Sequence, residues 1–183
     1  MNEVLYPAKK GKYGIGLFNA VNLELARGII NAAEQTGSPV IMGTAEVLFP
    51  YGPLEEVSYY LIPMAKKARV PVVVHLDHGL KKETCLKALE LGFTSIMYDC
   101  STDPYEENIK KVREMADIAH SYGATIEGEL GHVGGAEGAT EAEILAAINE
   151  VKAGEVSAPA EEGANEPLLD ASTIVAGSVK KEK

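Results

Sequence analysis

Short apolar runs rich in β-branched residues recur along this chain about every 25–30 residues, and a stretch with helical periodicity follows most of them. This alternation predicts parallel βα units, because two parallel strands need a crossover connection, which is usually a helix. We expect strands near residues 13–18, 39–43, 71–75, 94–99 and 124–129, and helices near residues 22–35, 55–67, 81–91 and 104–122.

The third apolar run, Val-Pro-Val-Val-Val at residues 70–74, leads directly into His75, Leu76, Asp77 and His78. In α/β proteins, ligands and chemistry collect at the carboxyl ends of parallel strands. If the strand continues unbroken, alternation places His75 and Asp77 on one face and Leu76 and His78 on the other. Taken alone, a histidine here is either a hydrogen-bonded structural residue or a ligand.

Two further strands end in carboxylates. The run that begins at Ser95 ends at Asp99, and the run from Ala124 ends at Glu129. Each acidic residue by itself is typical of a helix cap or a solvated loop, but their repeated placement favours a site. If the strands are neighbours, His78, Asp99 and Glu129 converge on one rim, and an imidazole with carboxylate oxygens suits zinc or a similar divalent ion.

With these motifs the chain resembles the class II, zinc-dependent fructose-bisphosphate and tagatose-bisphosphate aldolases, from about Tyr13 through Gly138. An H-x-D-H-G segment and an E-L-G-x-x-G-G segment are specific in combination. The resemblance rests on residues 16–19, 70–79, 92–99 and 127–135.

The resemblance implies roles for single residues. Asp77 matches the catalytic acid that moves a proton at the substrate oxygen beside the bond being broken. Glu137, on the glycine-rich loop, matches the acid that carries the proton at the nucleophilic carbon. Asn19 matches an asparagine that contacts the substrate.

The metal ligands are implied in the same way. His78 matches a ligand of the catalytic zinc, and Asp99 and Glu129 match carboxylates at an alternative, more buried position. We expect His75 to support this site rather than to bind metal. The implied cofactor is Zn²⁺, with a second divalent or monovalent cation as a further possibility.

The implied reaction is reversible aldol cleavage of a phosphorylated ketose, a ketose 1,6-bisphosphate, to glycerone phosphate and glyceraldehyde 3-phosphate. Zinc as a Lewis acid stabilises the negative charge that cleavage develops, so no lysine is needed to form a Schiff base. The sequence does not discriminate between the fructose and tagatose bisphosphates.

The chain departs from the family pattern after Gly138. The two downstream zinc-histidine segments, G-T-x-H-G and H-G-x-S-G, are not found, and neither are the glycine-serine loop and the N-x-D-T segment that grip phosphate. Of the remaining histidines, His120 lies on a helical stretch, and His132 is either a loop side chain or near the metal rim. A (β/α)₈ barrel needs at least about 200 residues, whereas this chain has 183.

The predicted fold is therefore α/β, an incomplete TIM-type (β/α) barrel of about five βα units with a helical and disordered C-terminal tail. We divide the chain into a partial barrel domain (1–138), an amphipathic helix (139–154) and a flexible acidic tail (155–183). Residues 167–179 of the tail form either one weak strand or a docking segment.

Composition limits the partners and the cellular location that we expect for the protein. The pI of about 4.9 argues against non-specific nucleic-acid binding. No apolar run has the length of a membrane span, and the N-terminus lacks the apolar core of a signal peptide. Cys85 and Cys100 are two lone thiols rather than a disulfide framework, which favours a cytoplasmic location.

Three functions stay open at this point. The chain is an aldolase whose site a partner chain completes in a homo-oligomer, a dimer or larger. Alternatively, it is a truncated, catalytically impaired homologue that serves as a metal-binding or oligomerising module. In the third case the tail redirects the fold to a protein–protein role.

Overall fold

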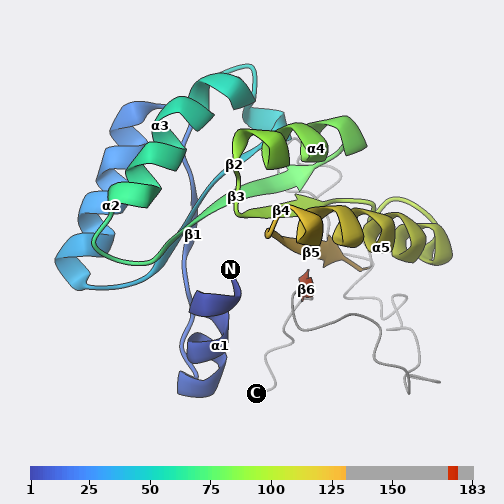
Figure 1. Ribbon diagram of the computed structural model, residues 1–183, viewed down its shortest axis with the longest axis horizontal. Helices are drawn as coiled ribbons and strands as arrows, with labels where there is room; N and C mark the ends of the chain where they lie inside the picture. Colours follow the sequence, from blue (N-terminus) through green and yellow to red (C-terminus); the bar gives the residue numbers. More distant parts are fainter. Residues whose placement is uncertain (131–172, 177–183) are drawn as a thin grey trace, which may run out of the picture.

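The computed structural model describes residues 1–130 and 173–176 (Figure 1). Its six strands form one sheet in chain order, and every neighbouring pair is parallel. The strands are β1 (Leu17–Asn19), β2 (Val40–Ala45), β3 (Val72–Gly79), β4 (Ser95–Tyr98), β5 (Thr125–Glu129) and β6 (Thr173–Ala176).

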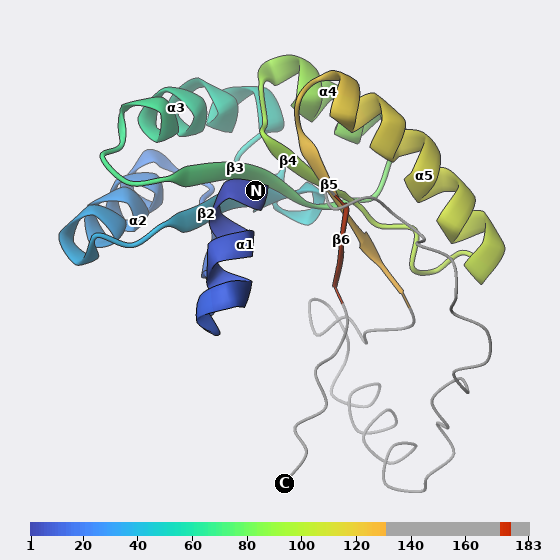
Figure 2. The same cartoon turned by 60° about the horizontal axis from the view of Figure 1, so that its bottom comes forward.

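Four helices connect the first five strands and cover the same face of the curved sheet (Figures 1 and 2). They are α2 (Leu23–Thr36), α3 (Leu54–Lys67), α4 (Lys82–Leu91) and α5 (Tyr105–Ser121). A parallel sheet with its crossovers on one side and sequential strand order is the arrangement of a (β/α) barrel wall. The predicted barrel-type α/β fold is thus confirmed over the described residues.

An additional helix, α1 (Asn2–Gly11), precedes β1 and lies on the opposite face of the sheet (Figure 2). This helix was not among those expected from the sequence. Its buried residues Val4 and Ala8 lie four positions apart, on one helical face. Val4 packs against Ile41 of β2 and Val73 of β3, so α1 covers the concave side of the sheet near the amino-terminal ends of these strands and leaves their carboxyl ends open.

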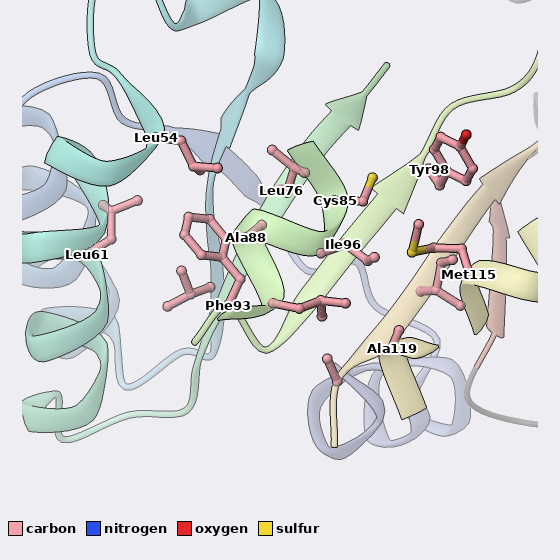
Figure 3. Close-up of a cluster of buried hydrophobic side chains, with 14 of the residues drawn as sticks. Leu54, Leu61, Leu76, Cys85, Ala88, Phe93, Ile96, Tyr98, Met115 and Ala119 are labelled. Atoms are coloured by element: carbon pink, nitrogen blue, oxygen red, sulfur yellow. The ribbon is translucent and has the colours of Figure 1, made fainter. Parts of the chain in front are cut away.

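The main hydrophobic core lies between the sheet and the four covering helices (Figure 3). Leu76 of β3 and Ile96 of β4 point into this core and are fully buried. Burial of such a side chain stabilises the fold by roughly 1.5–3 kcal/mol. Since alternate strand residues face opposite sides, the intervening residues His75 and Ser95 point to the concave face, where the candidate site lies.

A short 3₁₀ helix, η1 (Glu46–Leu48), follows β2 and holds the loop that leaves β3. The Glu46 Oε2 accepts hydrogen bonds from the backbone N–H groups of Leu80, at 2.8 Å, and Lys81, at 3.3 Å. Lys81 is the residue before α4, so this carboxylate satisfies one of the N–H groups that a helix start leaves without a partner, in addition to that of Leu80 in the loop. The end of β3 is thereby fixed on the side of β2.

The sixth strand falls inside the tail, at residues 173–176, within the segment for which one weak strand was one of two alternatives. It pairs with β5 from Ile126 to Glu129. The predicted amphipathic helix at 139–154 and the rest of the predicted flexible tail lie outside the described residues, so the division of the chain into three parts stays a prediction.

Candidate metal and catalytic site

A bulge at the end of β3 determines where its histidine points. Leu76 pairs with Ile96, but the next pair joins Gly79 to Tyr98, so β3 uses three steps where β4 uses two. Within the bulge His78 adopts a left-handed backbone with φ of 44°. Strict alternation would place His78 on the face opposite to Asp77, but it requires an unbroken strand, and the bulge interrupts β3. His78 instead turns towards the face that carries Asp77, and its Nε2 lies 4.0 Å from Asp77 Oδ1.

Gly79 completes this turn because no side chain fits there. An added Cβ would lie 2.7 Å from Cys85 Sγ, 2.8 Å from Leu76 Cδ2 and 2.9 Å from the Met97 carbonyl oxygen. Gly79 thus packs directly against the helical layer, and the imidazole of His78 is directed away from that layer.

His78, Asp99 and Glu129 meet at the carboxyl ends of β3, β4 and β5. His78 Nδ1 lies 2.8 Å from Asp99 Oδ2 and 4.0 Å from Glu129 Oε2. One potential ligand atom from each residue lies within 4.8 Å of the other two. Two carboxylates this close repel each other unless a cation lies between or beside them, and imidazole nitrogen with carboxylate oxygens is a donor set that zinc accepts. The residues present therefore fit a divalent ion.

The electrostatic setting matches this chemistry. Burial by itself would raise the pKa of Asp99, but hydrogen bonds from Ser101 and His78 hold that pKa below its usual range. For His78, burial opposes the charged form, yet the hydrogen bond to Asp99 and the charges of Asp77, Asp99 and Glu129 raise its pKa overall. The carboxylate pair thus creates a negative potential at the imidazole.

Asp77 lies beside this cluster and is held from the far side by Asn19. The Asn19 Nδ2 donates to Asp77 Oδ2 at 2.8 Å. The side chain of Asp77 is 21% exposed and that of His78 is 43% exposed, so both can be reached from solvent. The structure places Asn19, Asp77, His78, Asp99 and Glu129 in one region. The positions at strand ends predicted the convergence of His78, Asp99 and Glu129, whereas Asn19 and Asp77 were expected there from the family resemblance.

Polar side chains also lie beneath the cluster of His78, Asp99 and Glu129, closer to the middle of the sheet. His75 is fully buried, its Nδ1 lies 2.8 Å from Ser95 Oγ, and its Nε2 lies 3.5 Å from Glu127 Oε2. Burial lowers the pKa of His75 to about 4, and burial together with the charge of Asp77 raises that of Glu127 to about 7. This arrangement favours the expected supporting role of His75, because one of its two ring nitrogens already has a hydroxyl partner.

Glu127 was not among the candidate site residues expected from the sequence. Alternation along β5 was the available signal, since it places Glu127 on the same face as Glu129. Of the other sequence candidates, Glu137 and His132 lie outside the described residues. His120 lies in the last turn of α5, at the end of the helix opposite to the carboxyl end of β5.

Fold and site together define a barrel-type α/β protein whose polar groups gather at the carboxyl ends of its strands. The profile of the family described as "Fructose-bisphosphate aldolase class-II" matches residues 1–159. The chain therefore belongs to the class II fructose-bisphosphate aldolase family.

Individual relatives agree with this assignment. The chain is 42% identical to the fructose-bisphosphate aldolase of Thermus caldophilus over 135 residues, which are 74% of this chain and 44% of that protein. It is 43% identical to the probable fructose-bisphosphate aldolase of Bacillus subtilis over 140 residues, 75% of this chain and 49% of that one. The chain thus spans about half the length of the curated relatives it matches.

Solved structures show the same relationship in three dimensions. The YdjI aldolase of Escherichia coli K12 superposes with a TM-score of 0.70 and 38% identity, over 72% of this chain and 51% of that one. A putative fructose-1,6-bisphosphate aldolase of Coccidioides immitis gives a TM-score of 0.68 and 30% identity, over 75% and 49% of the two chains.

Among the described residues, no helix has the length and apolar character needed to cross a membrane.

Proposed function

We propose that this chain carries half of a zinc-dependent aldolase site for a ketose 1,6-bisphosphate, which is cleaved to glycerone phosphate and glyceraldehyde 3-phosphate. The observation that carries the proposal is the convergence of His78, Asp99 and Glu129 within 4.8 Å beside the Asp77 carboxylate. Family membership supports the reaction class.

The three convergent residues would hold the metal. Bound there, Zn²⁺ would supply Lewis-acid stabilisation of the negative charge that develops on the ketose when the carbon–carbon bond breaks. A second divalent or monovalent cation is compatible with the two carboxylates.

In the cleavage direction, Asp77 accepts the proton of the hydroxyl group next to the bond that breaks. The electron pair of that bond stays on the three-carbon fragment that becomes glycerone phosphate, and the other fragment leaves as the aldehyde. Glu137 returns a proton to the carbon that received the electron pair. Asn19 keeps one oxygen of Asp77 in a hydrogen bond, so the carboxylate meets the substrate in a defined orientation.

The relatives are about twice as long as the matched region, so the described residues supply only part of the proposed site. A homo-oligomer, as a dimer or larger, is a further part of the proposal, and gel filtration of the purified protein tests it. Both cysteines are free thiols, which agrees with a cytoplasmic setting.

A second candidate function is that of a metal-binding or oligomerising module without turnover. It is supported by the three potential ligands that the described residues bring together. The position of the complete His78, Asp99 and Glu129 cluster within the described half favours this alternative over a function without metal.

One experiment separates the two functions. Zinc content and aldol cleavage of the fructose and tagatose bisphosphates are measured on the purified protein, with EDTA treatment and with the Asp77→Ala, His78→Ala and His120→Ala variants. We expect zinc loss in His78→Ala only, and zinc-dependent turnover that Asp77→Ala abolishes. Zinc binding without turnover in the wild type would favour the module, and zinc content unchanged in His78→Ala would overturn both.

A further inference from the structure

The hydrogen bond between Asn19 and Asp77 joins two strands that are not neighbours. Asn19 ends β1 and Asp77 lies on β3, with β2 between them. In the sheet register Asn19 is opposite Gly43, and Gly43 is opposite His75, whereas Asp77 is opposite Ala45. The asparagine side chain therefore crosses over β2 and reaches one layer further along β3.

Gly43 lies directly beneath this crossing. A Cβ at residue 43 would lie 2.8 Å from Asn19 Oδ1, closer than Cβ atoms come to other heavy atoms, and 3.0 Å from the His75 carbonyl oxygen. The third neighbour, Leu17 Cδ2, would be at an ordinary 3.7 Å. The side chain of Asn19 is the neighbour that any larger residue at position 43 would displace.

The backbone does not explain why this residue is glycine. The glycines with positive φ among the described residues are Gly37, Gly92 and Gly123, and Gly43 is not among them. Position 43 lies in the middle of a regular strand, where glycine weakens a sheet and commonly marks a close approach of other groups. Space, rather than backbone conformation, is what Gly43 provides.

The asparagine amide depends on Asp77 for its place. Asn19 Oδ1 is a buried atom without a hydrogen-bond partner among the described residues, so the Nδ2 bond to Asp77 is the contact that orients the amide. A bond from Asn19 to a carboxylate is charge-assisted and stronger than a neutral hydrogen bond. It occupies Oδ2 of Asp77 and leaves Oδ1 on the side of His78.

We propose that Gly43 is a positioning residue for Asp77: the missing side chain at position 43 lets Asn19 cross β2 and hold the carboxylate in its reactive orientation. The consequence for catalysis rests on the proposed function. Asn19 then acts through Asp77, in addition to the substrate contact that its position implies. A methyl group at residue 43 moves the Asn19 amide, and the Asp77 carboxylate loses its anchor.

The first test needs no activity. Side-chain amide resonances of Asn19 are assigned in the metal-free protein by their absence from Asn19→Ala, and are compared in Gly43→Ala and Gly28→Ala. Gly28 is the matched control because an added Cβ there meets nothing within 4 Å. We expect the resonances to move to the position of an unbonded amide in Gly43→Ala and to stay in Gly28→Ala. Unchanged resonances in Gly43→Ala would overturn the proposal.

The second test uses turnover by the zinc-loaded protein. Because a displacement of about 1 Å can cost roughly 100-fold in rate, we expect Gly43→Ala to lower kcat by about 10–100-fold. KM should rise by a smaller factor than kcat falls, since the substrate contact of Asn19 is weakened together with the anchor of Asp77. A raised KM with unchanged kcat would overturn the proposal.

A double variant separates Asn19 from the other neighbour of residue 43. In Asn19→Ala/Gly43→Ala the clash with the amide is gone and only the approach to the His75 carbonyl remains. We expect this variant to fold and to lose no more kcat than Asn19→Ala alone. An additional loss as large as that of the single Gly43→Ala change would show that the effect passes through His75 and would overturn the proposal. If the wild type has no turnover, the proposed function fails, while the amide resonances still decide this inference.

Discussion

His75 Nε2 lies 3.5 Å from Glu127 Oε2, directly below the convergent groups at the strand ends, and Ser95 Oγ lies 2.8 Å from the other ring nitrogen. The fully buried imidazole of β3 is thus linked to β4 by a hydrogen bond, whereas its Nε2 faces Glu127 of β5 without one. These three strands also carry His78, Asp99 and Glu129, so His75 lies beneath the predicted ligands.

Removing the hydroxyl from this link should destabilise the protein. Ser95→Ala leaves Nδ1 of the buried His75 without its partner, and an unsatisfied buried polar group costs about 1–3 kcal/mol. We expect the free energy of unfolding in urea to fall by that amount. Ser38→Ala, at an exposed position, is the control and should change it little. Equal stability of Ser95→Ala and the wild type would contradict the role of this hydrogen bond.

The carboxylates should dominate zinc affinity. In Asp99→Asn and Glu129→Gln a charged ligand becomes a neutral amide of similar size, and we expect zinc affinity to fall by more than about 100-fold, beyond the 10–100-fold typical of outer-shell changes. Asp117→Asn, on the exposed side of α5, should leave the affinity unchanged. Competition with a chromophoric chelator measures all three. If Asp99→Asn and Glu129→Gln bound zinc with the affinity of the wild type, Asp99 and Glu129 would not be metal ligands.

Gly79 should not tolerate even one methyl group. An added Cβ would lie within 2.9 Å of Cys85 Sγ, Leu76 Cδ2 and the Met97 carbonyl oxygen, the last of which belongs to a strand backbone. Overpacking of this kind costs about 1–3 kcal/mol, which corresponds to a loss of roughly 2–12 °C in Tm. Thermal unfolding of Gly79→Ala would show this loss. In Gly14→Ala, where the added group meets nothing within 4 Å, Tm should stay near that of the wild type.

Cys85 should resist thiol reagents in the folded protein. Burial raises the pKa of this thiol to about 12 from an ordinary 9.0. Between these values the folded state retains a proton that the unfolded chain releases, so stability falls as the pH rises above 9.0. We expect iodoacetamide to modify Cys85 slowly at pH 8 and rapidly in denaturant, as followed by peptide mass spectrometry. Rapid modification without denaturant would contradict its burial on the face of α4 that packs against β3 and β4.

Much of this fold can be predicted from apolar periodicity. The five expected strands and four expected helices are present, and apolar runs mark strands such as β2 and β4 because these are buried along their whole length. Strand β1 is less well predicted: it begins at Leu17 rather than at residue 13, and its residues are partly or fully exposed. Helix α1 escaped prediction because it is short, contains Pro7 and carries the charged residues Lys9 and Lys10. In a helix those lysines lie in the last turn, where positive charge is favourable.

The convergence of polar strand ends was also predictable, but its details were not. Alternation cannot reveal the bulge that turns His78 towards Asp77, because a bulge is a property of the pairing with β4. The bond from Asn19 to Asp77 depends on the register of three strands and on the space above Gly43. Alternation places Glu127 on the same face of β5 as Glu129, but only the fold shows that this face is the concave one. The bulge and the bond from Asn19 to Asp77 arise from tertiary contacts that no local pattern encodes.

The strand order of the sheet has a consequence for synthesis of the protein. Each of the strands from β2 to β5 pairs with the one made just before it, so every new βα unit meets an edge that already exists when it leaves the ribosome. The wall of the barrel can therefore grow by successive addition from the N-terminus, without waiting for distant segments. Cotranslational growth of this kind would bring the predicted ligands together in the order His78, Asp99, Glu129, with the last one arriving only when β5 has been added.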